Sequence, residues 1–184
     1  KPKNKKQEYW FTVLWKYWIW SIFVFAFLVY GNTFFNDYSL DDELVTRNHR
    51  LTSQGLGFDN LQKIFTEPYY KDDMGYSYGY RPLTFLSFTI EHSLFVDNPG
   101  ISHFINVLLY TLLCILLLKT LERILQKHDS AIPFLAVIIF TLHPLHTEVV
   151  ASIKNRDEIL SFLFASISLY TLLSYSISFP KRLV

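Results

Sequence analysis

WFTVLWKYWIWSIFVFAFLVY, residues 10–30, is a block of aromatic and aliphatic side chains interrupted by Thr12, Lys16 and Ser21. A helix that crosses a bilayer needs about 20 mostly apolar residues, which this block supplies. The block is too long for the apolar part of a secretion signal, and it lacks a cleavage site of small residues. The sequence therefore predicts a retained transmembrane helix, with Lys16 near its cytoplasmic end.

The composition of the whole chain also indicates a membrane protein. Of its 184 residues, 51% are hydrophobic and 18% are charged, whereas soluble domains carry about 25% charged residues. Cys114 is the single cysteine, so neither a disulfide framework nor a cysteine metal site is expected. We expect an all-α integral membrane protein.

Three further apolar segments predict membrane helices, which makes about four in all. Residues 101–121 and 159–178 are long enough to span a bilayer. The segment 132–153 is weaker, because its apolar part is short and ends at Leu142. It crosses only if the helix continues to residue 153, or if the bilayer is locally thin or covered by other protein.

Basic residues set the expected orientation, because lysine and arginine are enriched on the cytoplasmic side of membrane proteins. Four of the first six residues are lysines, so residues 1–9 are expected to form a cytoplasmic tail rather than a nucleic-acid contact. Also expected in the cytoplasm are the loop at residues 122–131 and the end at residues 179–184, which should continue in a longer protein. A short extracytoplasmic loop is expected at residues 154–158.

The longest connection, residues 31–100, is then an extracytoplasmic loop that should fold against the membrane surface. Apolar residues recur in it at helical spacing at Leu56, Phe58, Leu61, Ile64 and Phe65. Residues 81–95 are too short to cross the bilayer, so we expect an interfacial or re-entrant helix that begins at Pro82. Glu91, on the polar side of this helix, is expected to be exposed to solvent.

A cluster of acidic residues follows the first predicted span directly. Asp41 and Asp42 lie within a turn or two of the expected membrane surface. Carboxylates there can act as a general base toward a hydroxyl acceptor, or hold a divalent cation against a phosphate. A structural interpretation also stands, because Ser39 followed by Asp42 fits a capping box at the start of a helix. Both interpretations stay open.

A second polar cluster lies on the same expected face of the membrane as the first. Its members are His143, His146, Glu148, Lys154, Arg156, Asp157 and Glu158. Lys154 and Arg156 suit a lipid-linked phosphate at the headgroup level, and Arg81 has the same chemistry. The two histidines lack a clear third metal ligand, and the last two acids equally fit the first turn of a helix.

Four segments resemble, in order and spacing, the N-terminal part of the transmembrane-and-tetratricopeptide O-mannosyltransferase-like family. They are FFNDYSLDD (residues 34–42), YRPLTFLSFTIEHSLF (80–95), ISHFINVLLYTLLCILLL (101–118) and FTLHPLHTEVVASIKNRDEIL (140–160). The motifs YRPLT and HPLHTEVV together are the most specific to the family. An acidic pair after the first helix is common to the wider GT-C group of glycosyltransferases. The family has many more membrane helices than this chain, and often a tetratricopeptide region.

The resemblance implies a GT-C-like module that transfers a sugar, mannose, from a polyprenyl-phosphate donor to hydroxyls of an acceptor protein on the extracytoplasmic side. It places the catalytic base at Asp41 or Asp42. By the same resemblance, the donor phosphate and sugar would be bound by Arg81, His143, His146, Glu148 and Arg156, to which the charge argument adds Lys154. The expected location is a bacterial inner membrane or the membrane of the endoplasmic reticulum. A divalent cation is left open as a cofactor.

A second class of function stays open, in which the chain is a non-catalytic membrane subunit. It would then serve as a docking platform for other subunits of a larger membrane complex. This alternative is favoured by the small number of helices, which can hardly enclose a lipid-sugar cavity alone. In either case the chain contacts membrane lipid, and no nucleic-acid partner is expected.

Overall fold

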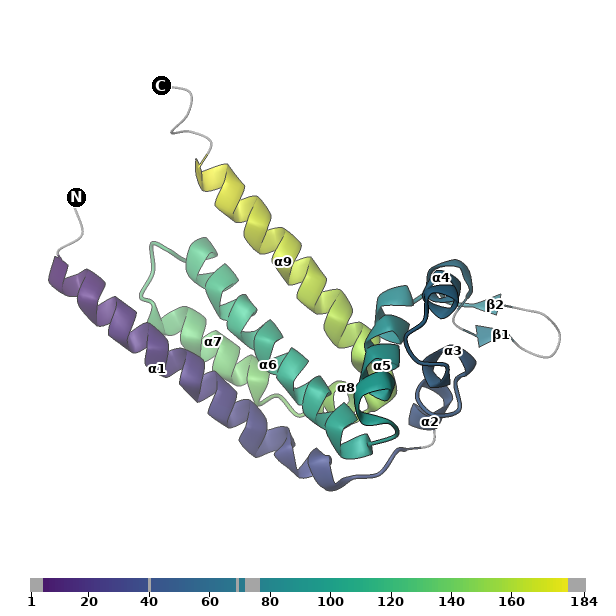
Figure 1. The fold of residues 1–184 in the computed structure, drawn as a ribbon. Coiled ribbons are helices and arrows are strands. Elements are labelled where there is room, and N and C mark those ends of the chain that lie inside the picture. The colour runs from purple at the N-terminus through teal and green to yellow at the C-terminus, as the bar shows by residue number, and fades with distance from the viewer. Residues whose placement is uncertain (1–4, 40, 69, 72–76, 179–184) are drawn as a thin grey trace.

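The computed structural model describes the backbone of residues 5–39, 41–68, 70–71 and 77–178, and the side chains of residues 16–39, 41–68 and 79–175. An elongated bundle is formed by helices α1 (Lys5–Tyr30), α6 (Pro99–Ile124), α7 (Ala131–Thr141) and α9 (Arg156–Ser178). Shorter elements form a cap at one end of this bundle (Figure 1). The first turn of α1 and the last turn of α9 lie at the other end.

The cap contains short elements from two stretches of the chain. From the first stretch come η1 (Gly31–Phe35), α2 (Asp42–Val45), α3 (Arg50–Ser53), α4 (Phe58–Thr66) and α5 (Pro82–Phe95). The second stretch adds α8 (His146–Ala151) and η2 (Ile153–Asn155). Two-residue strands β1 (Tyr70–Lys71) and β2 (Ser77–Tyr78) pair antiparallel, with Tyr70 opposite Tyr78.

Helix α6 is the centre of the bundle. Figure 1 shows it between α1 and α7 on one side and α9 on the other. Its buried residues Val107 and Cys114 share one apolar cluster with Ile22 of α1, Val137 of α7 and Ile159 of α9. Half of the apolar stretch of α6 that could span a membrane is buried within the described chain, against 22% of the corresponding stretch that includes α1 and 11% of the one that includes α9. The outer helices therefore leave most of their apolar surface uncovered within the described chain.

Three segments are long and apolar enough to cross a membrane, namely Lys16–Phe35, Pro99–Ile124 and Ile153–Tyr175. They overlap three of the four predicted spans, residues 10–30, 101–121 and 159–178. The fourth predicted span, residues 132–153, is divided between α7 and α8, so of its two stated conditions for crossing only a locally thin or protein-covered bilayer stays open. Helix α7 has 11 residues, or about 16 Å at 1.5 Å per residue, roughly half the thickness of the hydrocarbon layer. Its crossing of the bilayer stays a prediction.

Pro144 accounts for the break between α7 and α8. The residue before a proline is disfavoured in a helix, and proline itself has no N–H to donate. The last carbonyl groups of α7 consequently lack helical partners. The Tyr110 hydroxyl lies 3.2 Å from the Phe140 carbonyl oxygen and 3.3 Å from that of Thr141, and the Tyr30 hydroxyl lies 3.3 Å from the same Thr141 oxygen. The Phe140 carbonyl oxygen also accepts a hydrogen bond from the His143 backbone N–H at 3.2 Å. Two tyrosines from neighbouring helices thus add hydroxyl partners at this helix end, where buried backbone groups require them.

Helix α5 connects the cap to the bundle. It begins at Pro82, as predicted, and it packs against α3, α4 and α9. Phe85 and Phe88 are buried, and Glu91 is only 6% exposed. The expected exposure of Glu91 to solvent is therefore wrong, because a basic partner described below draws it into the protein. A position of α5 in the membrane interface, or as a re-entrant helix, stays a prediction.

A substitution at Gly100, in the first turn of α6, tests the tight contact between α6 and η1. A Cβ added to Gly100 would lie 2.8 Å from the carbonyl oxygen of Phe34, so the backbone would have to move. We expect Gly100→Ala to lower the free energy of unfolding by about 1–3 kcal/mol, the usual cost of overpacking. Gly57→Ala is the matched control, since its added Cβ meets nothing within 4 Å. Thermal unfolding in detergent, followed by circular dichroism, should separate the two variants, and equal midpoints would contradict the contact.

Candidate functional site

Asp42 joins the first loop to the turn between α8 and α9. Its side chain is buried, and its Oδ2 accepts hydrogen bonds from the Ser39 backbone N–H at 3.0 Å and the Ser39 hydroxyl at 2.6 Å. Its Oδ1 accepts from the backbone N–H of Lys154 at 2.8 Å and from the Ser152 hydroxyl at 3.4 Å. The predicted capping box is not formed, because α2 begins at Asp42 with Asp41 at its N-cap and the Ser39 hydroxyl donates to Asp42. The bonds to Ser152 and Lys154 hold distant segments together.

Asp41 lies beside Asp42 but faces outward. Its side chain is 54% exposed and forms an ion pair with the Lys154 ammonium group, which is 40% exposed. Exposed ion pairs contribute little to stability, so this pair can open at small cost. Of the two predicted bases, Asp41 is therefore the one within reach of an incoming hydroxyl group, and Asp42 is enclosed.

Arg156 is fully buried at the start of α9. Its guanidinium donates to Glu91 Oε2 at 2.8 Å, to Asn106 Oδ1 at 2.7 Å and to the Ser102 carbonyl oxygen at 3.1 Å. The Phe88 ring centroid lies 4.2 Å from the guanidinium carbon, a separation that suits a cation–π contact. These contacts join α5, α6 and α9. They support a structural role for Arg156, and its contact with a donor phosphate stays a prediction.

Arg81 lines a pocket between the start of α5 and the first turns of α9. The pocket has a volume of about 280 Å³. The lining side chains include Tyr80, Arg81, Leu83, Asp157, Leu160 and Phe164. Arg81 Nη1 lies 2.8 Å from Asp157 Oδ2, and the Arg81 side chain is 44% exposed. The pocket thus combines an accessible cation with apolar walls, which suits a ligand that carries a phosphate on a hydrocarbon chain.

A second pocket, of about 240 Å³, contains His146 and Glu158 together with Tyr110, Phe140 and Phe162. His146 Nδ1 lies 2.8 Å from the Tyr110 hydroxyl. Burial lowers the pKa of His146, so its imidazole is neutral at pH 7. This pocket shares no lining residue with the Arg81 pocket. His146 and Arg81 therefore line separate pockets, and their joint role in one donor site stays a prediction.

The remaining predicted residues are His143, in the turn before α8, and Glu148, on α8, and both are exposed. His143 Nδ1 accepts a hydrogen bond from the Leu145 backbone N–H at 3.3 Å, which stabilises this turn. Over the described residues, no group of three or more His, Cys, Asp or Glu side chains is placed to hold a metal ion. A divalent cation stays open as a cofactor.

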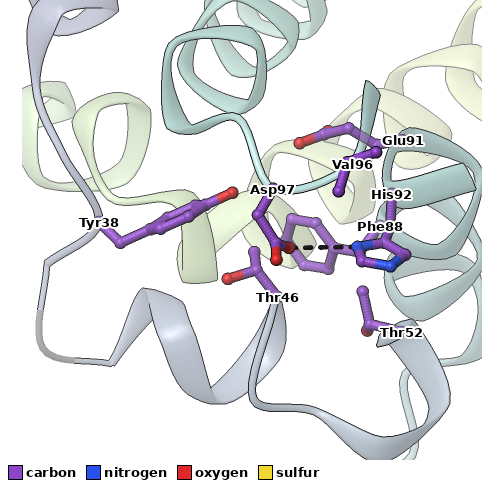
Figure 2. Close-up of a pocket in the computed structure, with 8 residues that line it drawn as sticks. All are labelled: Tyr38, Thr46, Thr52, Phe88, Glu91, His92, Val96 and Asp97. Atoms are coloured by element: carbon purple, nitrogen blue, oxygen red, sulfur yellow. Dashed lines mark hydrogen bonds and ion pairs between the residues drawn. The ribbon is translucent and has the colours of Figure 1, made fainter. Parts of the chain in front are cut away.

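Figure 2 shows a small polar pocket between α5 and the segment that carries Tyr38 and Thr46, lined also by Glu91, His92 and Asp97. Its volume of about 10 Å³ is near the minimum that admits one water molecule, so it is too small for a sugar. His92 Nδ1 lies 3.2 Å from Asp97 Oδ1 across the pocket. Burial raises the pKa of the Tyr38 hydroxyl, which therefore stays protonated at neutral pH.

Several residues at the site were missed by the sequence analysis. Asn106 and Ser102 are buried polar residues within the apolar helix α6, and polar side chains inside a membrane helix usually have partners. That signal was available in the sequence. The pairing of Glu91 with Arg156, and of Asp157 with Arg81, had no local signal, because each pair joins segments that are far apart in the chain.

Comparison with known proteins relates this chain to one group of membrane enzymes. The mouse protein O-mannosyl-transferase TMTC2 is 32% identical over 148 residues, which cover 77% of this chain. The chain is homologous to the TMTC protein O-mannosyl-transferases. The Caenorhabditis elegans protein O-mannosyl-transferase F38B6.6 is 30% identical over 70% of this chain, and mouse TMTC1 is 37% identical over 48% of it. The predicted relationship is thereby confirmed.

The homology to the TMTC proteins covers only a small part of their length. The matched region is 17% of mouse TMTC2, 19% of the C. elegans protein and 10% of mouse TMTC1. No family model matches this chain, and no solved structure matches it.

The buried network around Arg156 predicts a large effect on stability. We expect Arg156→Ala to lower the free energy of unfolding by about 3–5 kcal/mol, because it leaves the buried Glu91 carboxylate without its partner. Glu91→Gln keeps the shape of the side chain and should have a smaller effect in the same direction. Arg47→Ala is the control, since Arg47 pairs with Glu43 at the surface. Unfolding midpoints in detergent measure all three, and an Arg156→Ala midpoint equal to that of Arg47→Ala would contradict the network.

The two neighbouring aspartates are expected to differ in their effect on stability. Asp42→Asn has only one acceptor oxygen, so its amide group must face the N–H of either Ser39 or Lys154. We expect it to lose about 1–3 kcal/mol of stability, whereas Asp41→Asn should change stability by less than about 0.5 kcal/mol. Chemical unfolding of the two variants checks this difference. Equal losses would show that Asp42 is not the residue that holds the loop.

Proposed function

We propose that this chain is part of a membrane glycosyltransferase that transfers a sugar, mannose, from a polyprenyl-phosphate donor to hydroxyl groups of an acceptor protein. The proposal is carried by the meeting of Asp41 with Lys154, two exposed groups of opposite charge from segments far apart in the chain. The homology to proteins named as O-mannosyl-transferases supports the choice of reaction and sugar. The extracytoplasmic side is proposed from the positive charge at the other end of α1.

In the proposed reaction Asp41 acts as the general base. Its carboxylate takes the proton of the acceptor hydroxyl while the hydroxyl oxygen forms a bond to the anomeric carbon of the sugar. The bond between that carbon and the phosphate oxygen breaks, and its electron pair leaves with the phosphate. Lys154 stabilises the negative charge that develops there, once it has moved from Asp41 to the phosphate. Asp42 is a positioning residue, since it holds the Lys154 backbone.

The Arg81 pocket is the proposed binding site of the donor lipid. Arg81 contacts the phosphate, and Leu83, Leu160 and Phe164 line the pocket beside it for the first units of the hydrocarbon chain. Because α9 exposes most of its apolar surface, the rest of the hydrocarbon chain of the donor continues along α9 into the membrane. Asp157, the partner of Arg81, must release it when the phosphate binds.

Sugar transfer by the full-length protein in membranes tests the role of Asp41. We expect Asp41→Asn to lower the rate of transfer from polyprenyl-phosphate mannose by about 10²–10⁴-fold, the usual contribution of a general base. The unfolding midpoint should stay unchanged. Asp59→Asn, which changes an exposed aspartate on α4, should transfer at the normal rate. An Asp41→Asn variant with undiminished transfer would exclude Asp41 as the base.

A non-catalytic role as a docking platform is the second candidate. It is favoured by the low burial of α9. Only 11% of the apolar stretch that includes α9 is buried within the described chain, so this helix offers a long face to other membrane helices. The same assay separates the two. A platform predicts that the full-length protein transfers no sugar, while α9 variants such as Leu172→Ser disrupt assembly with other subunits.

A further inference from the structure

We propose that helix α4 is a membrane-surface anchor, which presses an apolar patch into the lipid at the boundary between headgroups and acyl chains. The α4 patch consists of Leu56, Phe58, Leu61 and Phe65. These side chains are 53%, 85%, 37% and 43% exposed, respectively. The proposed occupant of this surface is a lipid bilayer.

The faces of α4 are divided in three. Asn60 and Ile64 form a buried edge against the rest of the cap. With about 3.6 residues per turn, Asp59, Gln62 and Thr66 fall together on a polar face. Phe58, Leu61 and Phe65 lie between the buried edge and the polar face. An ordinary surface helix turns its apolar stripe toward the protein core, but on α4 only Ile64 does so.

This division is typical of a helix that lies in a membrane interface. Such a helix places large apolar side chains in the lipid and keeps charged and polar side chains in water. Aromatic residues are favoured at this depth, and two of the four residues in the α4 patch are phenylalanines. The polar face would then point away from the membrane.

The position of α4 in the fold fits this arrangement. Figure 1 shows α4 at the flank of the cap, across α5 from the first turns of α9. The long helices run in the plane of that view, whereas α4 is seen nearly end-on, so its axis crosses theirs. A helix that lies across the bundle at the end of a membrane span is oriented along the surface of the bilayer.

The depth of α4 is fixed by its contacts with the cap. Asn60 Nδ2 donates to the carbonyl oxygens of Leu51 and Gly55, both at 2.7 Å. Ile64 packs in one buried cluster with Leu51 and Phe85. The hydroxyl of Tyr80, which also lines the Arg81 pocket, donates to the Phe65 carbonyl oxygen at 2.7 Å. The anchor therefore also sets the depth of that pocket, a consequence that rests on the proposed function.

Environment-sensitive labels on single cysteines test the anchor without any measurement of sugar transfer. In a Cys114→Ser background, Phe58→Cys and Phe65→Cys report on the patch, and Asp59→Cys and Gln62→Cys are matched controls on the polar face. Each variant of the full-length protein carries the fluorophore NBD and is reconstituted into phosphatidylcholine vesicles. Part of the lipid bears a nitroxide on the acyl chain close to the headgroup.

We expect blue-shifted emission from labels at positions 58 and 65, and quenching by the nitroxide lipid at least about two-fold stronger than at positions 59 and 62. Iodide in the water should quench the two controls more strongly. Equal access of iodide to all four labels would overturn the proposal. Shielding of positions 58 and 65 from both quenchers would also overturn it, because protein would then cover the patch. The fluorescence and quenching of the labels do not depend on sugar transfer, so a failure of the proposed function would leave them unchanged.

Discussion

The buried ion pair between Arg156 and Glu91 is the interaction on which the rest of this structure depends. A guanidinium and a carboxylate that are removed from water must find each other and must also satisfy their remaining donors and acceptors. Here Asn106 and the Ser102 carbonyl complete the set around the guanidinium. Because these residues come from three helices, the pair fixes α5, α6 and α9 relative to one another.

The exposed part of the site follows from this buried part. With Arg156 turned inward at the start of α9, its neighbours Lys154 and Asp157 reach outward to Asp41 and Arg81. The buried bonds of Asp42 to the Lys154 backbone hold the same turn from the other side. A buried pair thus positions two exposed pairs. Such support by inner contacts gives a binding site defined geometry before a ligand arrives.

Features of the bundle fit the membrane environment that its three candidate spans indicate. The break between α7 and α8 leaves carbonyl groups of Phe140 and Thr141 inside the bundle, where Tyr110 and Tyr30 replace water as partners. The exposed apolar faces of α1 and α9 need lipid or other helices around them. On the cap, the α4 patch presents the same kind of surface at the edge of the bundle.

Hydropathy, charge and proline by themselves determined the helical class, three candidate membrane spans and the start of α5 at Pro82, because these depend on local composition and spacing. The sequence also pointed to the two polar clusters that meet in the fold. Tertiary structure alone decided which of their members are buried. Asp42 is enclosed and Asp41 is not, and Arg156 is buried in a pair with Glu91. The physical reason is that burial of a charge depends on a partner from a distant segment, such as Glu91 for Arg156, and no local pattern specifies that pairing.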